Sequence, residues 1–489
     1  MWWPSRFEVA VVVSGIVSIG LEILAGRVLA PAFGSSIYTW GSIIGVSLLA
    51  LSLGYHRGGR LAKHVDPSAL DRCLLYTALY VVFLTVFGEY IITVSSALPV
   101  SPRYAALIPV MLLFGPPTYV LGFISPYAAE LSERSGEGAV SGHFYAVGTA
   151  GSLVGAFGTT FLLIPWMGTT AMYTVFAVIA SLPLMRDWRD PKAYTVVAVL
   201  VIGWLASTGG VVGPGSTVYE TATTYQDLRV ADENGVRTLY LDGHPQSAMY
   251  LDNRTGYPWS YPRYFHIPLL MRDDVNRVLF VGGGGFSGPK RFADMNITVD
   301  VVELDPDVIR VAKEYFGVEE SDDLNIFEGD GRTFLEDRNA SYDVIYLDAY
   351  RKNKVPFQLT TKEFMELTAE KMDDQGIVFS NTIGVDSGPG SEFPRSQYKT
   401  IGEVYRSTYY FPEGRSGLAQ NIEIIGSKQP RLSEAALLRR STMYDGLDLS
   451  DEIRNVERPV TGDVPVLTDR YAPVERLLQP LVGREYAAT

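Results

Sequence analysis

Three apolar runs in the C-terminal half of the chain are each followed or ended by a carboxylate. Glu303 ends VDVVE, Asp330 follows LNIFEG and Asp348 follows YDVIYL. The runs have the length and residue types of buried strands. Taken singly, each acid would be an ordinary strand-end cap or turn residue. Because the carboxyl ends of parallel strands in an open α/β sheet surround one crevice, the three acids together predict a ligand site.

A glycine-rich loop precedes these acids and strengthens the prediction. The apolar run RVLFV leads directly into Gly282, Gly283 and Gly284. Glycines there let the backbone turn sharply and approach a ligand closely. Glu303 follows about 20 residues later, where a carboxylate can accept hydrogen bonds from both hydroxyls of a ribose. The sequence therefore predicts a nucleoside-binding unit of the Rossmann type.

The order of these motifs resembles the spermidine synthase (polyamine aminopropyltransferase) family. The glycine loop, VELD, EGDGR and YDVIYLD carry the resemblance, and upstream TTYQDLRV and LYLDGHPQS look like that family's N-terminal β-domain. The apolar N-terminal half and the ending VLTDRYAPVERLL look like the membrane-fused branch of the family.

This resemblance implies roles for particular residues. The donor would be decarboxylated S-adenosylmethionine or S-adenosylmethionine itself, bound as a co-substrate. Gln226 would contact the sulfonium region, Glu303 the ribose, and Asp330 with Gly331 the adenine edge. Asp348 would be the catalytic carboxylate, because an attacking amine must lose its proton before it displaces the sulfur. The resemblance also assigns Tyr261, Tyr350 and Arg351 to the substrate side.

Departures from the family pattern leave the acceptor open. Gly285 stands where the family has an Asp after the third glycine, and Arg351 stands where it has a second Asp. The family's Tyr-His-Glu stretch is here Tyr261, Pro262 and Arg263. The lost carboxylates would have held ammonium groups of donor and acceptor, so their loss argues against putrescine. Arg351 and the nearby lysines would suit an anion, or would belong to a solvated loop.

The N-terminal half has the composition of a membrane domain. Residues 1–213 hold 11 Lys and Arg against 10 Asp and Glu, whereas the remaining residues hold 30 against 44. A spanning helix needs about 20 apolar residues. We predict seven spans, near Phe7–Ala30, Ile37–Tyr55, Leu74–Leu98, Ala105–Ala129, Phe144–Ile164, Thr169–Met185 and Ala193–Val212. The run around Gly151 and Gly155 is typical of close helix packing.

The charges of this half bear on its orientation and function. Basic loops at Arg57–Arg72 and Arg186–Lys192 should face the cytoplasm, yet a seventh span would then place the C-terminal half outside. Cofactor supply favours a cytoplasmic catalytic domain in the cell membrane, which requires one stretch to be re-entrant or an extra span. Glu22 and Arg27 form either a polar intramembrane site or a structural pair.

Composition excludes some partners. An acidic C-terminal half lacks the basic footprint that nucleic acid requires. Five scattered histidines and one cysteine give no metal-ligand spacing, so we predict no metal. The expected partners are the lipid bilayer and a small amine or a membrane-borne acceptor, and a homodimer is one open form of assembly.

The predicted organisation has three parts. A transmembrane helical domain covers residues 1–213, a small β-hairpin domain 214–270, and a Rossmann-like methyltransferase/spermidine synthase-type α/β domain 271–489. The leading function is a membrane-anchored, spermidine synthase-like aminopropyl transfer to an amine. Two alternatives are methyl or aminocarboxypropyl transfer from S-adenosylmethionine to a membrane-associated acceptor, and a polyamine transporter or sensor with a non-catalytic soluble domain.

Overall fold

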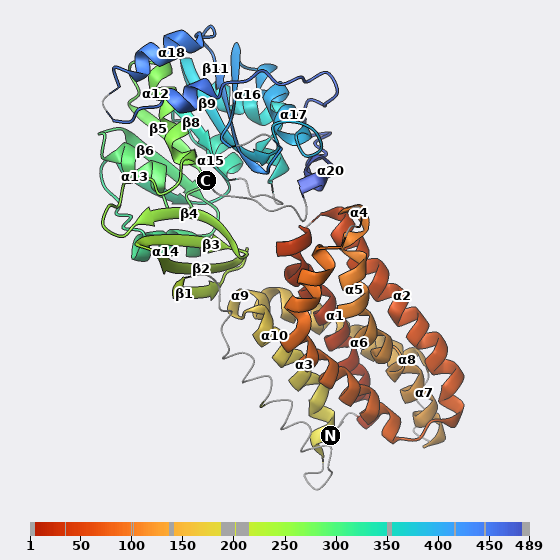
Figure 1. Ribbon diagram of the computed structural model, residues 1–489. Coiled ribbons are helices and arrows are strands. Elements are labelled where there is room, and N and C mark those ends of the chain that lie inside the picture. The colour runs from red at the N-terminus through yellow and green to blue at the C-terminus, as the bar shows by residue number, and fades with distance from the viewer. Residues whose placement is uncertain are drawn as a thin grey trace. The chain divides into compact units, whose positions relative to one another are not determined.

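The computed structural model divides the chain into two compact units, residues 1–212 and 213–489 (Figure 1). Each unit is described by itself. The structure describes residues 5–186, 201 and 215–481, apart from residues 35, 99, 101, 136–140, 350–354, 415–416 and 445.

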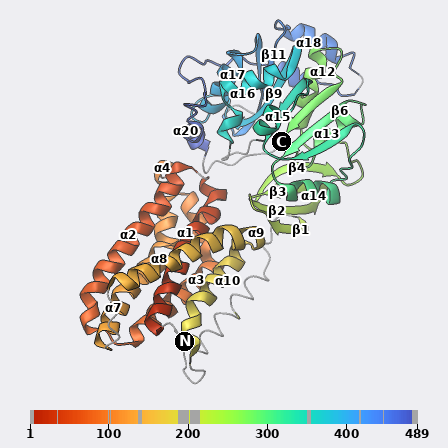
Figure 2. The same cartoon turned by 180° about the vertical axis from the view of Figure 1, so that it is seen from behind.

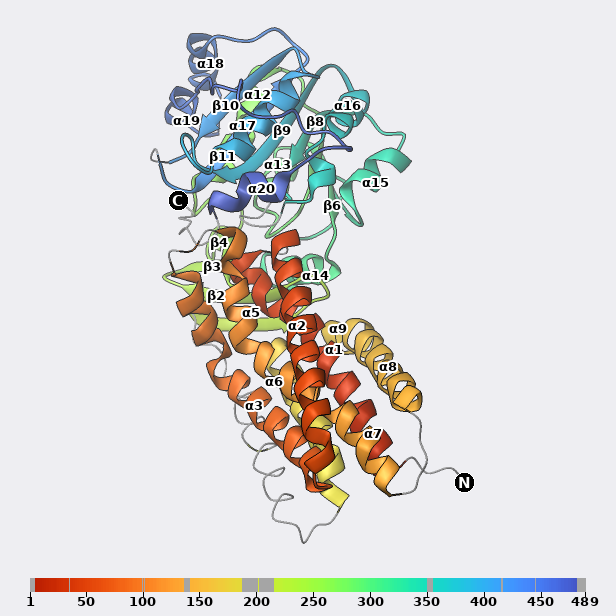
Figure 3. The same cartoon turned by 90° about the vertical axis from the view of Figure 1, so that its right-hand side faces the viewer.

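The first unit is entirely helical in its described residues. Its long helix α1 packs against α2, α3 and α8 (Figure 3). Shorter helices complete the bundle. The α-helices are α1 (Arg6–Phe33), α2 (Ile37–Leu61), α3 (Ser68–Ser96), α4 (Pro102–Ala105), α5 (Leu107–Leu113), α6 (Gly115–Leu121), α7 (Ile124–Arg134), α8 (Ser141–Gly158), α9 (Ile164–Trp166) and α10 (Thr169–Ser181).

Four helical stretches in the described residues are long and apolar enough to cross a membrane: Arg6–Phe33, Ile37–His64, Ser68–Ser96 and Gly142–Trp166. The region of the predicted fourth span is instead a pair of segments, Arg103–Leu113 and Gly115–Arg134, bent by 51°. Counting the bent pair as one span gives five. The predicted sixth span is a shorter apolar helix, Thr169–Leu184, and the predicted seventh lies almost entirely outside the described residues.

Small residues bring α1 and α8 into close contact. A Cβ added at Gly151 would lie 2.3 Å from the Val12 carbonyl oxygen, and one at Gly155 would lie 2.5 Å from that of Ile16. Backbone approach of this kind is how helices pack where lipid removes the hydrophobic driving force. Arg27 donates a 2.8 Å hydrogen bond to the Ile164 carbonyl oxygen.

The second unit begins with a four-stranded antiparallel sheet in the order β1-β2-β3-β4. Its strands are β1 (Ser216–Ala222), β2 (Asp227–Glu233), β3 (Val236–Leu241) and β4 (His244–Tyr250). Asn234-Gly235 and Asp242-Gly243 join successive strands, and all four residues have positive φ. Such pairs form tight hairpin turns whose twist matches the strands. The sheet lies beside α14 (Pro306–Tyr315) in Figures 1 and 2. Tyr219 of β1 stacks on Tyr315 of α14, with 5.2 Å between the ring centroids.

A seven-stranded sheet forms the centre of this unit, in the order β10-β11-β9-β8-β5-β6-β7. The strands β7, β6, β5, β8 and β9 are mutually parallel, and β11 and β10 continue the sheet antiparallel. The strands are β5 (Arg277–Val281), β6 (Thr298–Glu303), β7 (Leu324–Glu328), β8 (Tyr342–Leu347), β9 (Met372–Gly384), β10 (Ser407–Pro412) and β11 (Gln420–Ser427).

Alternation along the strands builds a core on each face of this sheet. In β5, Val278 and Phe280 join one hydrophobic cluster while Leu279 and Val281 join the other, as the period of two in a strand requires. One face packs α12 (Ile267–Met271), α13 (Ser287–Ala293), α14, α18 (Glu434–Ser441) and α19 (Ser450–Arg454). The other packs α15 (Gly331–Asp337), α16 (Lys362–Glu370) and α17 (Glu392–Gly402). The helix α20 (Val474–Leu478) packs on α17.

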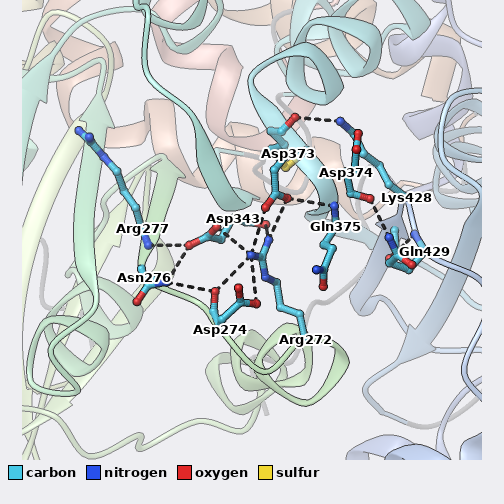
Figure 4. Close-up of polar contacts among 12 residues, drawn as sticks. Arg272, Asp274, Asn276, Arg277, Asp343, Asp373, Asp374, Gln375, Lys428 and Gln429 are labelled. Carbon is cyan, nitrogen blue, oxygen red and sulfur yellow. Dashed lines mark hydrogen bonds and ion pairs between the residues drawn. The ribbon is translucent and has the colours of Figure 1, made fainter.

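An ion-pair network closes the amino-terminal edge of the parallel strands (Figure 4). Arg272, whose side chain is only 3% exposed, lies 3.0 Å from Asp343, 3.1 Å from Asp373 and 3.3 Å from Asp274. Asp343 in turn accepts bonds from the backbone N–H groups that begin β5. The network joins the starts of β5, β8 and β9 and leaves the opposite edge for a ligand. The predicted fold class is confirmed: apolar helices, then a small antiparallel sheet, then an α/β unit.

Candidate active site

The site lies where the chain direction across the sheet reverses, between β5 and its neighbours β6 and β8. The loops that follow β5 and β8 leave the same edge there and approach each other closely. Gly282 has φ +98°, and a Cβ at this position would lie 2.5 Å from the Asp348 carbonyl oxygen. Only glycine satisfies both conditions without strain. This is the position at which open α/β sheets bind ligands.

A cavity of about 340 Å³ opens at this edge. The predicted residues that line it come from both sheets and the loops between strands: Gln226, Tyr261, Gly282, Gly284, Glu303, Asp330, Gly331 and Asp348. Gly283 is not part of the lining, but its N–H donates a 2.8 Å hydrogen bond to Glu303 Oε2. Tyr350 and Arg351 lie outside the described residues. The structure thus brings eight of the predicted residues together around one cavity, while their roles stay predictions.

Backbone donors hold the Glu303 carboxylate in place. Its Oε2 accepts from Gly283 N–H, and its Oε1 accepts from the N–H of Asp305 at 3.0 Å. A carboxylate fixed by main-chain groups keeps its direction without help from mobile side chains. A carboxylate held in a fixed direction at the end of β6 suits the predicted contact with the hydroxyls of a ribose.

Asp330 has a structural role in addition to its place in the cavity. Its Oδ1 accepts hydrogen bonds from the N–H groups of Arg332 and Thr333 at 3.1 and 3.0 Å, so it caps the N-terminus of α15. The following Gly331 packs tightly, because a Cβ there would lie 2.4 Å from Val281 Cγ1. The cap fixes the backbone at the predicted adenine edge.

Asp348 is a partly buried acid at the centre of the site. Its N–H donates to the Val281 carbonyl oxygen at 2.9 Å, and its Oδ1 accepts from Asn381 Nδ2 at 2.8 Å. The pKa of the Asp348 carboxyl is raised to about 7, mainly because the group is removed from water. The hydrogen bond from Asn381 lowers this pKa, and the negative charge of Glu303 raises it. A carboxyl with a pKa near neutrality can exchange a proton with a substrate under physiological conditions.

Gln226 reaches the same cavity from the small sheet. Its Nε2 donates to Asp305 Oδ2 at 3.0 Å, and Thr223 donates to the same oxygen at 2.6 Å. Its Oε1 is buried without a hydrogen-bond partner among the described residues. With the amide orientation fixed in this way, the oxygen is the atom of Gln226 that remains for an electropositive group such as a sulfonium.

The positions that depart from the family pattern have their own packing. Gly285 donates its N–H to Ser247 Oγ at 3.0 Å, and a Cβ at Gly285 would lie 2.8 Å from the Ser247 Cβ. The loop is therefore closed against β4, with no room for the family's Asp. Arg263 pairs with Glu452 and also donates to the Asp448 carbonyl oxygen, so it serves the C-terminal segment and does not line the cavity.

Sequence reasoning missed polar residues that line the cavity on its β9 and β11 side. Asn381 on β9 donates to Asp348, and Asn421 is the second residue of the adjacent strand β11. Trp259 and Gln246 also line the cavity. A signal for Asn381 existed, because the polar pair Ser380-Asn381 interrupts the apolar run IVFSNTIG. No local pattern marks Asn421, since β11 joins the site only through its antiparallel pairing with β9.

Comparisons with known proteins find relatives of the second unit. Residues 263–385 match the family described as Spermine/spermidine synthase domain. A polyamine aminopropyltransferase of Vibrio vulnificus is 24% identical over 281 residues, which cover 54% of this chain and 93% of the relative. A polyamine aminopropyltransferase of Chromobacterium violaceum is 31% identical over 160 residues, 32% of this chain and 61% of the relative. Among solved structures, a probable spermidine synthase from Corynebacterium glutamicum ATCC 13032 has a TM-score of 0.44 and 19% identity, covering 53% of this chain and 97% of that one.

Fold and site together define a doubly wound α/β unit with an acidic cavity at its switch point. The family match over residues 263–385 and the curated relatives show that this unit is similar to the spermidine synthase family, which confirms the resemblance seen in the sequence.

Proposed function

We propose that the chain is a transferase that moves an aminopropyl group from decarboxylated S-adenosylmethionine to an amine. The observation that carries this proposal is the convergence of Gln226, Glu303, Asp330 and Asp348 on one cavity at the switch point. The names of the curated relatives, polyamine aminopropyltransferases, support the same reaction.

Each of these residues has its own role in the proposed reaction. Glu303 and the capped turn at Asp330 hold the nucleoside, and Gln226 Oε1 faces the sulfonium. The acceptor nitrogen attacks the carbon next to sulfur, so an N–C bond forms, the C–S bond breaks and methylthioadenosine leaves with the electron pair. Asp348 removes the proton that makes the nitrogen a nucleophile. With a pKa of about 7 the carboxyl is a matched base for this step at neutral pH.

S-adenosylmethionine is the second candidate for the donor, because Gly285 replaces an acid of the family pattern. Gly285 has no side chain, and its packing against Ser247 leaves no space for one. A site without that carboxylate discriminates less against the carboxylated donor, which favours methyl or aminocarboxypropyl transfer from S-adenosylmethionine as the runner-up.

Calorimetric binding of both donors to the detergent-solubilised chain decides between the two reactions. Tighter binding of decarboxylated S-adenosylmethionine, together with methylthioadenosine release in the presence of an amine, is the expected result. Tighter binding of S-adenosylmethionine, with S-adenosylhomocysteine as product, would transfer the assignment to a methyltransferase. Binding of neither would remove the enzyme proposal.

We also propose that the first unit anchors the enzyme as a multi-pass protein of the cell membrane, with the catalytic unit in the cytoplasm. The four long apolar helices and the bent pair support this. Retention in the membrane fraction after carbonate washing is expected. Protease protection of the C-terminal unit in right-side-out vesicles would agree with the cytoplasmic side, and its digestion would contradict it.

A further inference from the structure

One stretch of the cavity wall belongs to the short connection between β8 and α16. We call residues 355–359 the wall segment, and four of its residues line the cavity: Val355, Pro356, Gln358 and Leu359. Residues Phe357–Leu359 form a single turn of 3-10 helix. A connection of this kind takes its position from contacts with the rest of the chain. The predicted adenine edge at Asp330 and Gly331 lines the same cavity.

The C-terminal segment, residues 467–481, packs on the start of the wall segment. It contains LTDRYAPVERLL, a motif for which the proposed reaction gives no role. Val355 packs against a cluster that includes its apolar side chains Leu467, Val474, Leu477, Leu478 and Leu481. The Leu467 carbonyl oxygen also accepts a 2.8 Å hydrogen bond from the N–H of Lys362, in the first turn of α16. The C-terminal segment therefore holds one end of the wall segment and the helix that follows it.

Asp469 of the C-terminal segment reaches the other end of the wall segment through Arg332. Arg332 lies in the first turn of α15, directly after Gly331. Its Nη1 and Nη2 donate to Asp469 Oδ1 and Oδ2 at 2.8 and 2.7 Å, and Thr361 donates to Oδ1 at 2.6 Å. Arg332 Nη1 also donates to the Gln358 carbonyl oxygen at 3.3 Å. One guanidinium group therefore connects the predicted adenine edge, the wall segment and the C-terminal segment.

The geometry of the Arg332–Asp469 pair makes it stronger than an isolated surface ion pair. Two parallel N–H···O bonds fix the planar guanidinium against the planar carboxylate. The two side chains are 22% and 37% exposed, so water and salt screen the pair only in part. The hydrogen bonds from Arg332 hold the pKa of the Asp469 carboxyl below its usual value, so this acid is charged at neutral pH.

Resting on the proposed transferase function, we propose that Asp469 and Arg332 are positioning residues that hold the wall segment in place around the nucleoside of the donor. The C-terminal segment is then part of the donor-binding machinery. Neither residue lines the cavity, and both act through the backbone of Gln358. Because the wall segment shares the cavity with the predicted adenine edge, the pair acts on nucleoside binding and not on proton transfer at Asp348.

The test measures calorimetric binding of methylthioadenosine, the proposed product, to the full-length chain in detergent. Asp469→Asn keeps the shape of the side chain and removes its charge. It should weaken binding about 3- to 10-fold, the range expected when a partly exposed charge-assisted pair is lost. Arg332→Gln should weaken binding at least as much, because it also removes the hydrogen bond to Gln358. The double variant should bind no more weakly than Arg332→Gln, because the two residues act through one contact.

Turnover gives a second measurement that a merely structural role would not change. The KM for decarboxylated S-adenosylmethionine should rise by the same factor as the Kd in both single variants. The kcat at saturating donor should stay near that of the wild type, because Asp348 and its hydrogen bond from Asn381 are untouched.

Asp463→Asn is the matched control. Asp463 forms the same kind of two-bond pair with Arg395 of α17, at 2.6 and 2.9 Å, and neither residue lines the cavity. This variant should lower the melting temperature about as much as Asp469→Asn does. Its Kd for methylthioadenosine should equal that of the wild type.

Each other result contradicts a particular statement. A wild-type Kd in folded Asp469→Asn would overturn the proposal, and so would additive losses in the double variant or an equal loss in Asp463→Asn. If Asp469→Asn does not fold, Arg332→Gln tests the same contact from its other side, and a wild-type Kd in that variant would overturn the proposal. A wild type that binds neither methylthioadenosine nor decarboxylated S-adenosylmethionine would instead refute the proposed function.

Discussion

Replacing Asp348 with Asn should strongly reduce activity and at the same time stabilise the protein in a pH-dependent way. The carboxyl has a pKa of about 7 in the folded protein, against 3.8 for an ordinary Asp. A raised folded pKa means that ionisation favours the unfolded chain, so the stability of the wild type falls as pH rises from 4 to 7 and then levels. The difference between these two pKa values lowers the free energy of unfolding by at most about 4 kcal/mol. About 3 kcal/mol of this loss develops between pH 5 and pH 8.

The Asp348→Asn variant does not lose stability in this way, because its amide does not titrate and can still accept the hydrogen bond from Asn381. The melting temperature of Asp348→Asn should therefore exceed that of the wild type by a margin that is about 5 °C larger at pH 8 than at pH 5, for a unit of this size. Thermal unfolding of the full chain in detergent measures this difference. Asp337→Asn, a change at an exposed acid on α15, is the control and should show no dependence on pH.

The same titration should govern catalysis. With Asp348 as the base, kcat/KM should rise about tenfold per pH unit below 7 and level above it, and Asp348→Asn should lower kcat about 10²- to 10⁴-fold. A flat pH profile between 6 and 8 would refute the assignment of Asp348 as the base. A stability gain that is equal at pH 5 and pH 8 would refute the statement that burial of a charge is its cause.

Three further changes test the frame of the site. Gly282→Ala places a Cβ against the Asp348 carbonyl oxygen at a residue with positive φ. The change should lower the free energy of unfolding by about 2 kcal/mol or more and remove donor binding. A normal melting temperature and a normal donor Kd would contradict this prediction. Glu303→Gln keeps the shape of the side chain but loses its charge. Calorimetry should show an affinity for the donor that is lower by about 10- to 100-fold, with little change in melting temperature. An unchanged Kd would exclude the predicted contact of Glu303 with the ribose. Arg272→Met removes the buried cation that Asp343 and the half-exposed Asp373 share, and should cost about 1–3 kcal/mol. The donor Kd should not change, because Arg272 lies at the opposite edge of the sheet. A weakened Kd would mean that the two edges are coupled.

The sequence alone determined the kind of fold and the centre of the site. Apolar strands that end in acids, and a glycine run before them, are local patterns whose consequence in an open α/β sheet is general. Glu303, Asp330 and Asp348 could therefore be predicted to converge, and the structure places all three around one cavity. Hydropathy likewise predicted apolar helices in the first half, although length and a 51° bend reduce the spans in the described residues to four or five.

Only the tertiary structure decided what surrounds those acids. The capping bonds of Asp330, the loop closed by Ser247 against Gly285, and the pairing of Arg263 with Glu452 depend on residues far apart in the chain. The part of the cavity lining formed by Asn381 and Asn421 depends on the antiparallel register of β9 and β11. Register is fixed by the packing of whole faces, because a slip of one residue would turn every side chain to the other face. The acids that follow β6, β7 and β8 can therefore be predicted from local sequence, whereas the β9 and β11 side of the cavity exists only once the sheet has formed.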